Sequence, residues 1–393
     1  MIEEKEMIDG NRPGSGKAFC VAVAVALGAL AAPAQAQTSV TTYGYVKLDA
    51  IFNSVKSNAL VGDHALIPGT IRLDSAKANE EDNFLMHARQ SRLGFRTSTP
   101  TNMGPLTTLL EFDLFGTDGN ESSSNSHNVR LRHAYASLGA LSAGQFWTNF
   151  MFLPSFAETV DFGGHVGQIF VRQAQIRWTS KIDNGEWAVS IENPESVVAT
   201  PTAAAFRAND DRVPDVVGRV SFGVGKGQLS LVGMARNIRV DSAAAPAADD
   251  DKWGGAVGVT GVFPTWGKDD FKFGVHAGDV LGRYAGVSFF ADGVVNAAGK
   301  LELPDQWIAR AAYRHWWSST VRSSLVLSAG ESDNPVGTIG TLNRAMASAH
   351  LNLFWSPVPQ VNLGAEVIRA VREVESGEKG HLTRVQVSGQ YSF

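Results

Sequence analysis

Apolar and polar residues alternate along this chain in segments of about ten residues, the length that a tilted strand needs to cross a bilayer. In residues 43–53, Val46, Leu48 and Phe52 share one face of a period-two pattern, and Lys47 and Asp49 share the other. The same pattern predicts sixteen strands, at 43–53, 87–98, 106–115, 129–138, 141–149, 171–181, 186–193, 215–223, 227–237, 252–263, 270–279, 306–316, 320–332, 344–356, 360–373 and 381–393.

The connections between these strands alternate between short and long. The short ones are built from turn-forming residues, as in Pro-Thr-Asn-Met-Gly (100–104) and Lys-Ile-Asp-Asn-Gly (181–185). The long ones fall near 54–86, 116–128, 150–170, 194–214, 238–251, 280–305, 333–343 and 374–380, and the stretch 280–305 has room for a further strand pair. Short turns on one rim and long loops on the other predict an all-β fold, a transmembrane antiparallel β-barrel of 16 strands with periplasmic turns and extracellular loops.

The last predicted strand, 381–393, ends on an aromatic residue. Its apolar face carries Val385, Val387, Tyr391 and Phe393. A free terminus is normally solvated, so a terminal aromatic side chain needs an apolar environment, which a lipid-facing strand provides. This strand is expected to pair with 43–53 and close the barrel.

The first 36 residues have the three parts of a secretory signal: Lys17, the apolar run 18–31 and the Ala34-Gln35-Ala36 cleavage site. We therefore predict a cleaved signal peptide at 1–36, starting at Met1 or Met7, and a single barrel domain at 37–393. Cys20 is the only cysteine, so the mature chain would contain no thiol and no disulfide. Beyond Ala36 no apolar run has the length of a membrane-spanning helix.

Most tryptophans lie near the ends of predicted strands, where aromatic girdles of membrane barrels occur. The alternative is that they are ordinary core residues. The residues concerned are Trp147, Trp178, Trp187, Trp253, Trp307, Trp316, Trp317 and Trp355.

The chain resembles outer-membrane porins of the DcaP-like family. The resemblance is carried by S-R-L-G-F-R (91–96), R-L-R-H-A-Y-A-S-L-G (130–139), G-Q-F-W (144–147), E-T-V-D-F (158–162), V-R-Q-A-Q-I-R-W (171–178), A-Y-R-H-W-W (312–317) and W-S-P-V-P (355–359). It implies a homotrimer in the outer membrane of a Gram-negative bacterium, in contact with membrane lipid and lipopolysaccharide. It also implies that the barrel-assembly machinery reads the last strand, with Tyr391 and Phe393 as the signal. Some relatives carry a coiled-coil segment before the barrel, which is not expected here.

The charges separate into a basic interior and an acidic rim, although the net charge is only −5 at pH 7. Alternation places mostly arginines on the inner faces, whereas acids gather in the loops, for example at Asp249–Asp251. Arginine stays charged and presents a planar fork to carboxylates, so such a wall favours anions. The alternative is that these arginines pair with loop acids and stiffen the barrel.

The third long loop, Phe150 to Phe170, is too apolar to lie in water, which predicts that it folds into the lumen and forms a constriction. The alternative is an ordinary surface loop. The family resemblance supports the lumenal position and matches arginine-bearing strand motifs. The candidate constriction residues are Arg92, Arg96, Arg130, Arg132, Arg177, Glu158 and Asp161.

These features predict a channel for passive diffusion of small hydrophilic solutes, favouring anions such as dicarboxylates or aromatic acids. The alternatives are a general non-selective porin, a plugged structural barrel and an outer-membrane hydrolase. We expect no enzyme, cofactor or metal, because H-E-x-x-H and G-x-S-x-G motifs are missing and His133 is predicted to face lipid. The Asp249–Asp251 run predicts a solvated loop, and the alternative is that it holds Ca²⁺ or bridges lipopolysaccharide through a divalent ion. Acidic loops argue against nucleic-acid partners.

Overall fold

The computed structural model describes residues 37–77, 82–116, 122–207, 211–242 and 248–393, and Thr38–Phe393 form one compact unit. The signal peptide predicted at 1–36 lies outside the described residues. Within them, no helix combines the length and hydrophobicity needed to cross a bilayer.

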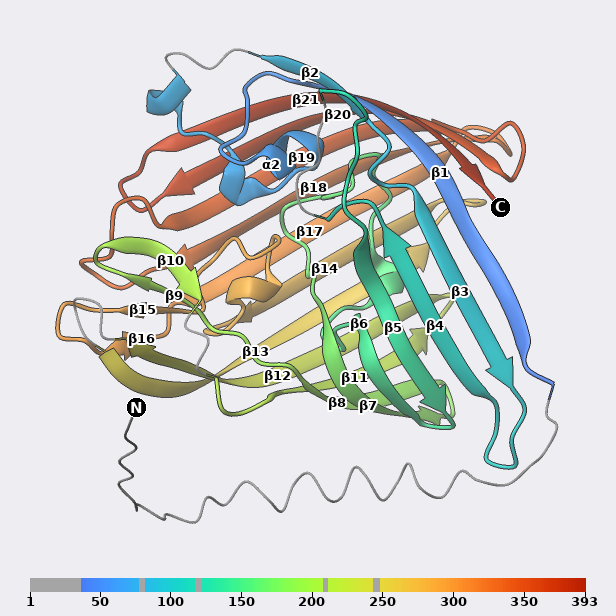
Figure 1. Ribbon diagram of the computed structural model, residues 1–393, viewed down its shortest axis with the longest axis horizontal. Helices are drawn as coiled ribbons and strands as arrows, with labels where there is room; N and C mark the ends of the chain where they lie inside the picture. The colour runs from blue at the N-terminus through green and yellow to red at the C-terminus, as the bar shows by residue number, and fades with distance from the viewer. Residues whose placement is uncertain (1–36, 78–81, 117–121, 208–210, 243–247) are drawn as a thin grey trace, which may run out of the picture. The chain divides into compact units, whose positions relative to one another are not determined.

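The compact unit is a closed antiparallel barrel with sixteen strand positions, as predicted (Figure 1). Each strand pairs with the next, and the last pairs with the first from Tyr45↔Ser392 to Asn53↔Arg384. The wall strands are β1 (Ser39–Asn53), β2 (Asn83–His87), β3 (Arg92–Thr99), β4 (Leu106–Asp113), β5 (Arg130–Leu138), β6 (Leu141–Trp147), β7 (Arg172–Ile182), β8 (Gly185–Glu192), β11 (Asp215–Val224), β12 (Gly227–Ser242), β13 (Ala248–Pro264), β14 (Asp270–Gly278), β17 (Asp305–Trp316), β18 (Val321–Asp333), β19 (Asn343–Trp355), β20 (Val361–Val374) and β21 (Lys379–Ser392).

One strand position is shared by two strands. β1 pairs with β3 through its first half and with β2 through its second half, so the strand predicted at 87–98 is interrupted at 88–91. In the interruption the backbone N–H of Lys47 donates to the Ser91 hydroxyl at 3.1 Å, which replaces a ladder bond. A break of this kind bends the wall locally.

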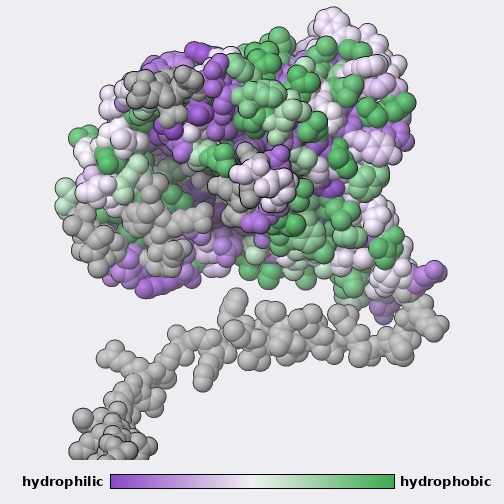
Figure 2. Space-filling view, turned by 45° about the horizontal axis from the view of Figure 1, so that its top comes forward, coloured by the Kyte–Doolittle hydropathy of each residue, from purple (hydrophilic) through white to green (hydrophobic). Residues whose placement is uncertain are grey.

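The outer face of the wall is apolar. Val46 is 59% exposed, Val257 66% and Leu351 59%, and hydrophobic side chains cover much of the visible outer surface (Figure 2). A continuous apolar wall is what bilayer contact requires. Several tryptophans are exposed on this wall near strand ends, but Trp147 packs on Phe170 inside the barrel, 4.9 Å between ring centroids.

The long loops are more structured than the alternation predicted. Residues 280–305 do contain two short strands, β15 (Gly293–Val295) and β16 (Leu301–Glu302). These strands are not part of the wall. They form a separate four-stranded sheet with β9 (Val197–Thr200) and β10 (Ala203–Arg207). Most of the loop predicted at 238–251 is strand, because β12 and β13 pair as far as Ser242↔Ala248. The short helices are α2 (Leu60–His64), η2 (Pro68–Thr70), η3 (Asp74–Lys77), η4 (Leu153–Ser155) and η5 (Gly282–Tyr284).

A hydrophobic core lies inside the barrel. Phe150 and Ile169 of the third loop pack in one cluster with Tyr284 of the sixth loop (residues 279–304) and with Ile308 and Ile368 of the inner wall. The loops therefore fill part of the lumen by burying apolar surface against the wall.

Candidate functional site

The third loop (residues 148–171, between β6 and β7) lies in the lumen, as the apolar residues in it predicted. Its first anchor is Asn149, whose side-chain amide donates to the carbonyl oxygens of Ala188 (3.1 Å) and Val217 (3.2 Å). The backbone N–H of Asn149 donates to Glu192 at 2.8 Å. Phe150, the next residue, is fully buried, so an apolar contact and the hydrogen bonds donated by Asn149 together hold the start of the loop.

The middle of the third loop reaches strands far around the barrel. Arg310 on β17 donates to the hydroxyl of Ser155 at 2.8 Å, and the Lys272 ammonium on β14 donates to the carbonyl of Phe156 at 2.9 Å. Alternation along β14 and β17 by itself places both wall residues on the inner face. Their partners depend on the path of the loop, which alternation does not describe.

Glu158 contacts arginines that the constriction hypothesis did not include. Its carboxylate accepts from Nε of Arg322 at 2.9 Å and lies 3.6 Å from Nη1 of Arg314. Arg314 also pairs with Asp270 at the start of β14. Glu158 is therefore part of a charged cluster on β14, β17 and β18, about eight positions around the barrel from β4 and β5.

Asp161 is a buried structural residue. Its carboxylate accepts from Nη1 of Arg384 at 2.6 Å and from the backbone N–H groups of Leu66 (2.9 Å) and Gly163 (2.7 Å). Both side chains of the Asp161–Arg384 pair are fully buried. Asp161 thus ties the third loop to β21 and to the first loop (residues 54–82), and it does not face Arg92, Arg130 or Arg132.

Three of the predicted arginines form one cluster, with Arg92 on β3 and Arg130 and Arg132 on β5. Arg132 pairs with Glu111 at 2.6 Å and with Asp113 at 2.9 Å. Arg130 pairs with Asp113 at 2.7 Å, and Arg92 lies 3.6 Å from Glu111. Three guanidinium groups therefore share two carboxylates, which leaves an excess positive charge. Fixed groups of this kind set the local potential of a pore.

A β-bulge in β5 determines which of its side chains point into this cluster. The register of β4 and β5 shifts between Glu111↔His133 and Phe112↔Leu131, so Arg132 is the extra residue of β5. Consequently Arg132 and His133 both point inward, and both are buried. The prediction that His133 faces lipid was wrong, because strict alternation does not allow for an inserted residue.

The third loop reaches this cluster through an aromatic residue. The guanidinium carbon of Arg130 lies 5.2 Å from the ring centroid of Phe162 and 5.3 Å from that of Phe115. The two rings stack with centroids 4.5 Å apart. Phe162 therefore contributes a cation–π contact on the loop side, where an acidic residue had been expected.

Arg96 and Arg177 lie apart from the cluster, and neither makes an ion pair within the described part of the chain. Arg96 is exposed on β3, 5.9 Å from the ring of Tyr43. Arg177 on β7 donates to the side-chain oxygen of Gln175 (2.7 Å) and lies 4.5 Å from the ring centroid of Phe146.

Arg177 lines a cavity of about 780 Å³ below the start of the third loop. Lys181, Arg219 and Lys226 line the same cavity, and the carboxylate of Glu186 pairs with Arg219 at 2.9 Å. Lys181, Arg219 and Lys226 were not among the candidate constriction residues. Inward parity was a usable signal for Lys181 on β7 and for Arg219 on β11. Lys226 lies in the turn after β11, where parity is undefined.

The described residues contain no group of three or more His, Cys, Asp or Glu side chains that could hold a metal ion. The Asp249–Asp251 run instead lies on β13, where Asp249 pairs with Arg239 at 2.8 Å and Asp251 accepts from Asn237 at 2.8 Å. The site is thus built from arginines, lysines, a few carboxylates and aromatic rings.

Comparison with solved structures gives the same architecture. The outer membrane channel DcaP of Acinetobacter baumannii matches with a TM-score of 0.76 and 23% identity, over 92% of this chain and 99% of that one. The anion-selective porin from Comamonas acidovorans matches with a TM-score of 0.59 and 13% identity, over 91% of this chain and 100% of that one. The trimer form of OmpT, an outer membrane protein of Vibrio cholerae, matches with a TM-score of 0.57 and 11% identity, over 91% and 99%.

No curated protein sequence matches this chain significantly. The sequence model of the DcaP outer membrane protein family matches residues 11–393. Because that match spans nearly the whole chain and the barrel is that of outer membrane channels, the chain belongs to the DcaP outer membrane protein family.

Proposed function

We propose that this outer membrane channel passes small hydrophilic solutes by passive diffusion and favours anions such as dicarboxylates or aromatic acids. The observation that carries the proposal is the excess of guanidinium groups over carboxylates along β3, β4, β5 and β7. Arg92, Arg130 and Arg132 share two carboxylates, and Arg96 and Arg177 make no ion pair among the described residues. Fixed positive charge in a confined aqueous path concentrates anions and repels cations.

The proposed mechanism needs positioned charges only. Arginine remains protonated, and its planar fork can bind a carboxylate while the solute stays partly hydrated. No residue is assigned a catalytic role, and no cofactor or metal is required. An outer-membrane hydrolase would need a nucleophile and a base that a substrate can reach. His350 contacts the Ser348 hydroxyl at 3.0 Å and Glu366 at 3.3 Å, but all three side chains are buried in the wall.

Single-channel reversal potentials in a salt gradient test the anion preference. Arg96→Gln and Arg177→Gln are the variants of choice, because neither side chain has a carboxylate partner among the described residues and so no acid is left unpaired. We expect each to lower the anion-to-cation permeability ratio by roughly twofold. Arg369→Ala, which removes a guanidinium from the outer face of β20, is the matched control and should leave the ratio unchanged. Cation preference in the wild type would refute the proposal.

A plugged structural barrel is the second candidate, and the hydrophobic core between the loops and the inner wall favours it. Liposome swelling separates the two. A channel predicts swelling with small solutes such as arabinose in proteoliposomes at a rate well above that of protein-free vesicles, whereas a plug predicts equal rates. Wild-type protein that conducts without charge preference would point to a general non-selective porin.

We further propose that the mature protein is a homotrimer in the outer membrane of a Gram-negative bacterium, exported by the signal at 1–36. The trimer form of the Vibrio cholerae OmpT supports a trimeric arrangement for this fold. Lipopolysaccharide, the barrel-assembly machinery and small anionic solutes are its proposed partners. Cross-linking of the detergent-purified protein tests the trimer, and N-terminal sequencing tests cleavage before Gln37.

A further inference from the structure

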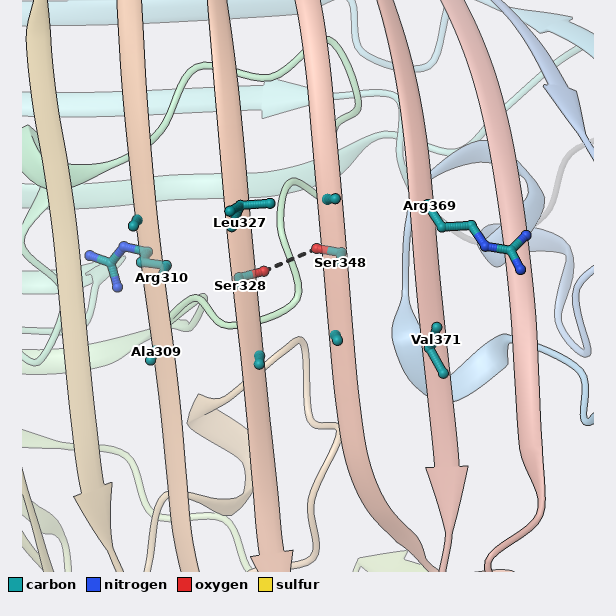
Figure 3. Close-up of a pocket in the computed structure, with 11 residues that line it drawn as sticks. Ala309, Arg310, Leu327, Ser328, Ser348, Arg369 and Val371 are labelled. Atoms are coloured by element: carbon teal, nitrogen blue, oxygen red, sulfur yellow. Dashed lines mark hydrogen bonds between the residues drawn. The ribbon is translucent and has the colours of Figure 1, made fainter.

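The outer wall of β17, β18, β19 and β20 contains a groove of about 560 Å³ (Figure 3). Its floor is made by short outward side chains in adjacent register, Ala309↔Ala329↔Ala347 in one row and Ala311 and Ala349 in the next. Leu327 and Val371 border it, and Ser328 and Ser348 hydrogen-bond behind the floor on the inner face. The outer surface is therefore recessed here, because its alanine side chains are shorter than the side chains on the neighbouring rows.

The neighbouring rows show the contrast. The row on the short-turn side of the groove carries Leu325, Leu351 and Val367, which are all about half exposed and project from the wall. The alanines cannot fill the space between such neighbours. In a bilayer an apolar trough of this kind is filled by a lipid chain, because an empty space forfeits dispersion contacts.

Charged residues border the groove on the long-loop side. Arg344 pairs with Glu331 at 3.3 Å and with Glu373 at 3.6 Å, and Lys379 pairs with Glu373 at 3.2 Å. All four lie on the outer side of the barrel near the ends of β18 to β21. This row marks the level at which the wall leaves the hydrocarbon and meets the head groups of the outer leaflet.

Arg369 lies at the edge of the groove, two positions along β20 from Val371. Its side chain is exposed on the outer face and extends over β21, where Nη1 donates to the Thr383 hydroxyl at 2.7 Å (Figure 3). Within the described residues no carboxylate pairs with it. A guanidinium facing lipid is costly unless it reaches an anionic head group, so its presence implies an anionic partner from the membrane.

We propose that this groove binds a lipopolysaccharide molecule, with an acyl chain of its lipid A over the alanine floor and a lipid A phosphate on Arg369. The charges at the groove favour a phosphorylated lipid. The two bases and two acids of the bordering row pair with one another, whereas Arg369 has no carboxylate partner among the described residues. The position of the groove below the long-loop rim selects the outer leaflet. Basic sites at the head-group level bind lipid phosphates in this way.

Native mass spectrometry of the full-length mature protein, delipidated in detergent and titrated with purified lipid A, tests the site. We expect Arg369→Ala to lower lipid A affinity by roughly fivefold, the contribution of one cation at a membrane surface. Arg369→Lys should retain most of the affinity. Ala347→Leu on β19, which fills the floor with Arg369 intact, should lower the affinity too. Ala365→Leu, on the outer face of the neighbouring strand β20 and outside the groove, should not.

Three results would overturn the proposal. The first is equal affinity for lipid A in the wild type, Arg369→Ala and Ala347→Leu. The second is equally tight binding of phosphatidylglycerol, which would assign the groove to an ordinary phospholipid. The third is a loss of oligomer stability in Ala347→Leu with lipid A affinity unchanged, which would assign the surface to a second copy of the chain. Thermal melting of each variant checks that the barrel is intact.

Discussion

Buried charged side chains join the loops to the inner wall of this barrel. Arg384 and Asp161 are both fully buried and pair at 2.6 Å. Arg236 pairs with Asp215 and with Asp292 of the sixth loop, and these side chains are buried as well. A buried pair gains little over an apolar pair of equal volume, but loss of one partner leaves an isolated charge at high cost. These residues therefore select one loop arrangement.

Asp161→Asn tests this role for the third loop. The substitution leaves the Arg384 guanidinium buried without its counter-charge, which should cost about 3–5 kcal/mol of folding free energy. We expect a lower melting temperature in detergent and faster proteolysis within residues 148–171. Asp241→Asn, at a half-exposed carboxylate, is the control and should melt with the wild type. A wild-type melting temperature in Asp161→Asn would contradict the assigned role.

His165 makes the third loop sensitive to acid. Neither ring nitrogen has a hydrogen-bond partner among the described residues, and burial, followed by the charge of Arg310, lowers the pKa of His165 well below its usual range. The unfolded chain therefore binds more protons than the folded one below pH of about 6.5, so stability is lost as the pH falls through that value.

His165→Gln should accordingly reduce the acid sensitivity. We expect the melting temperature of the wild type to fall more between pH 7.5 and pH 5 than that of the variant. Other buried histidines contribute equally to both proteins, so the difference between them reports on His165. An identical drop in the two proteins would exclude this residue as a source of acid sensitivity.

At the scale of single elements, the bulged β4–β5 pair determines which side chains face the lumen, and the regular β21–β1 pair closes the barrel. The bulge in β5 brings Arg132 and His133 to the inner face together, and it thereby builds the Glu111–Asp113 arginine cluster. At the closing seam, the Phe393 N–H donates to the Gly44 carbonyl at 3.1 Å, and the Gly44 N–H donates to the Phe393 carbonyl at 3.2 Å. The last residue is thus paired backbone, and its ring is 57% exposed on the outer side.

Deletion of Phe393 tests whether Tyr391 and Phe393 form an assembly signal, as we still predict. The deletion removes one terminal pair and an exposed ring, which leaves the remaining seam from Tyr45 to Asn53 intact. We expect much less assembled barrel, measured as heat-modifiable mobility in outer membrane fractions, and unchanged conductance of the molecules that do assemble. Normal assembly would reduce the terminal ring to a space-filling role.

At the scale of the whole molecule, the sixth loop packs inside the barrel against the inner wall. Asp292 is fully buried and accepts from Arg236, from the backbone N–H of Arg283 at 3.1 Å and from that of Val197 at 2.8 Å. Through these bonds the loop is held against β12 and against β9, which lies in the connection between β8 and β11. The width available to a solute beside the sixth loop therefore depends on how firmly these bonds hold the loop against the wall.

Asp292→Asn should therefore speed solute entry. Loss of the charge weakens the contact with Arg236 and raises the fraction of time that the sixth loop spends away from the wall. We expect faster liposome swelling, with the largest relative gain for the bulkiest solutes. Asp333→Asn, at an exposed carboxylate at the end of β18, is the control. Unchanged rates for all solutes in Asp292→Asn would show that the sixth loop does not limit flux.

The sequence by itself determined the wall of this protein. The number and order of the strand positions and the short turns follow from alternation and turn residues, because each depends on neighbours within about ten residues. The split of one position between β2 and β3 and the strands within the long loops did not follow from alternation. The same reasoning predicted the lumenal third loop, since its apolar residues needed burial, and the inward arginines.

Only the tertiary structure decided which inward groups meet. Glu158 pairs with Arg322, 164 residues away, and Asp161 with Arg384, 223 residues away, because closure of the barrel brings those strands to the loop. The bulge at Arg132 and the core between the loops and the wall likewise depend on distant packing. Local alternation specifies the face on which a side chain lies, whereas its partner depends on the path of the loops across the closed barrel.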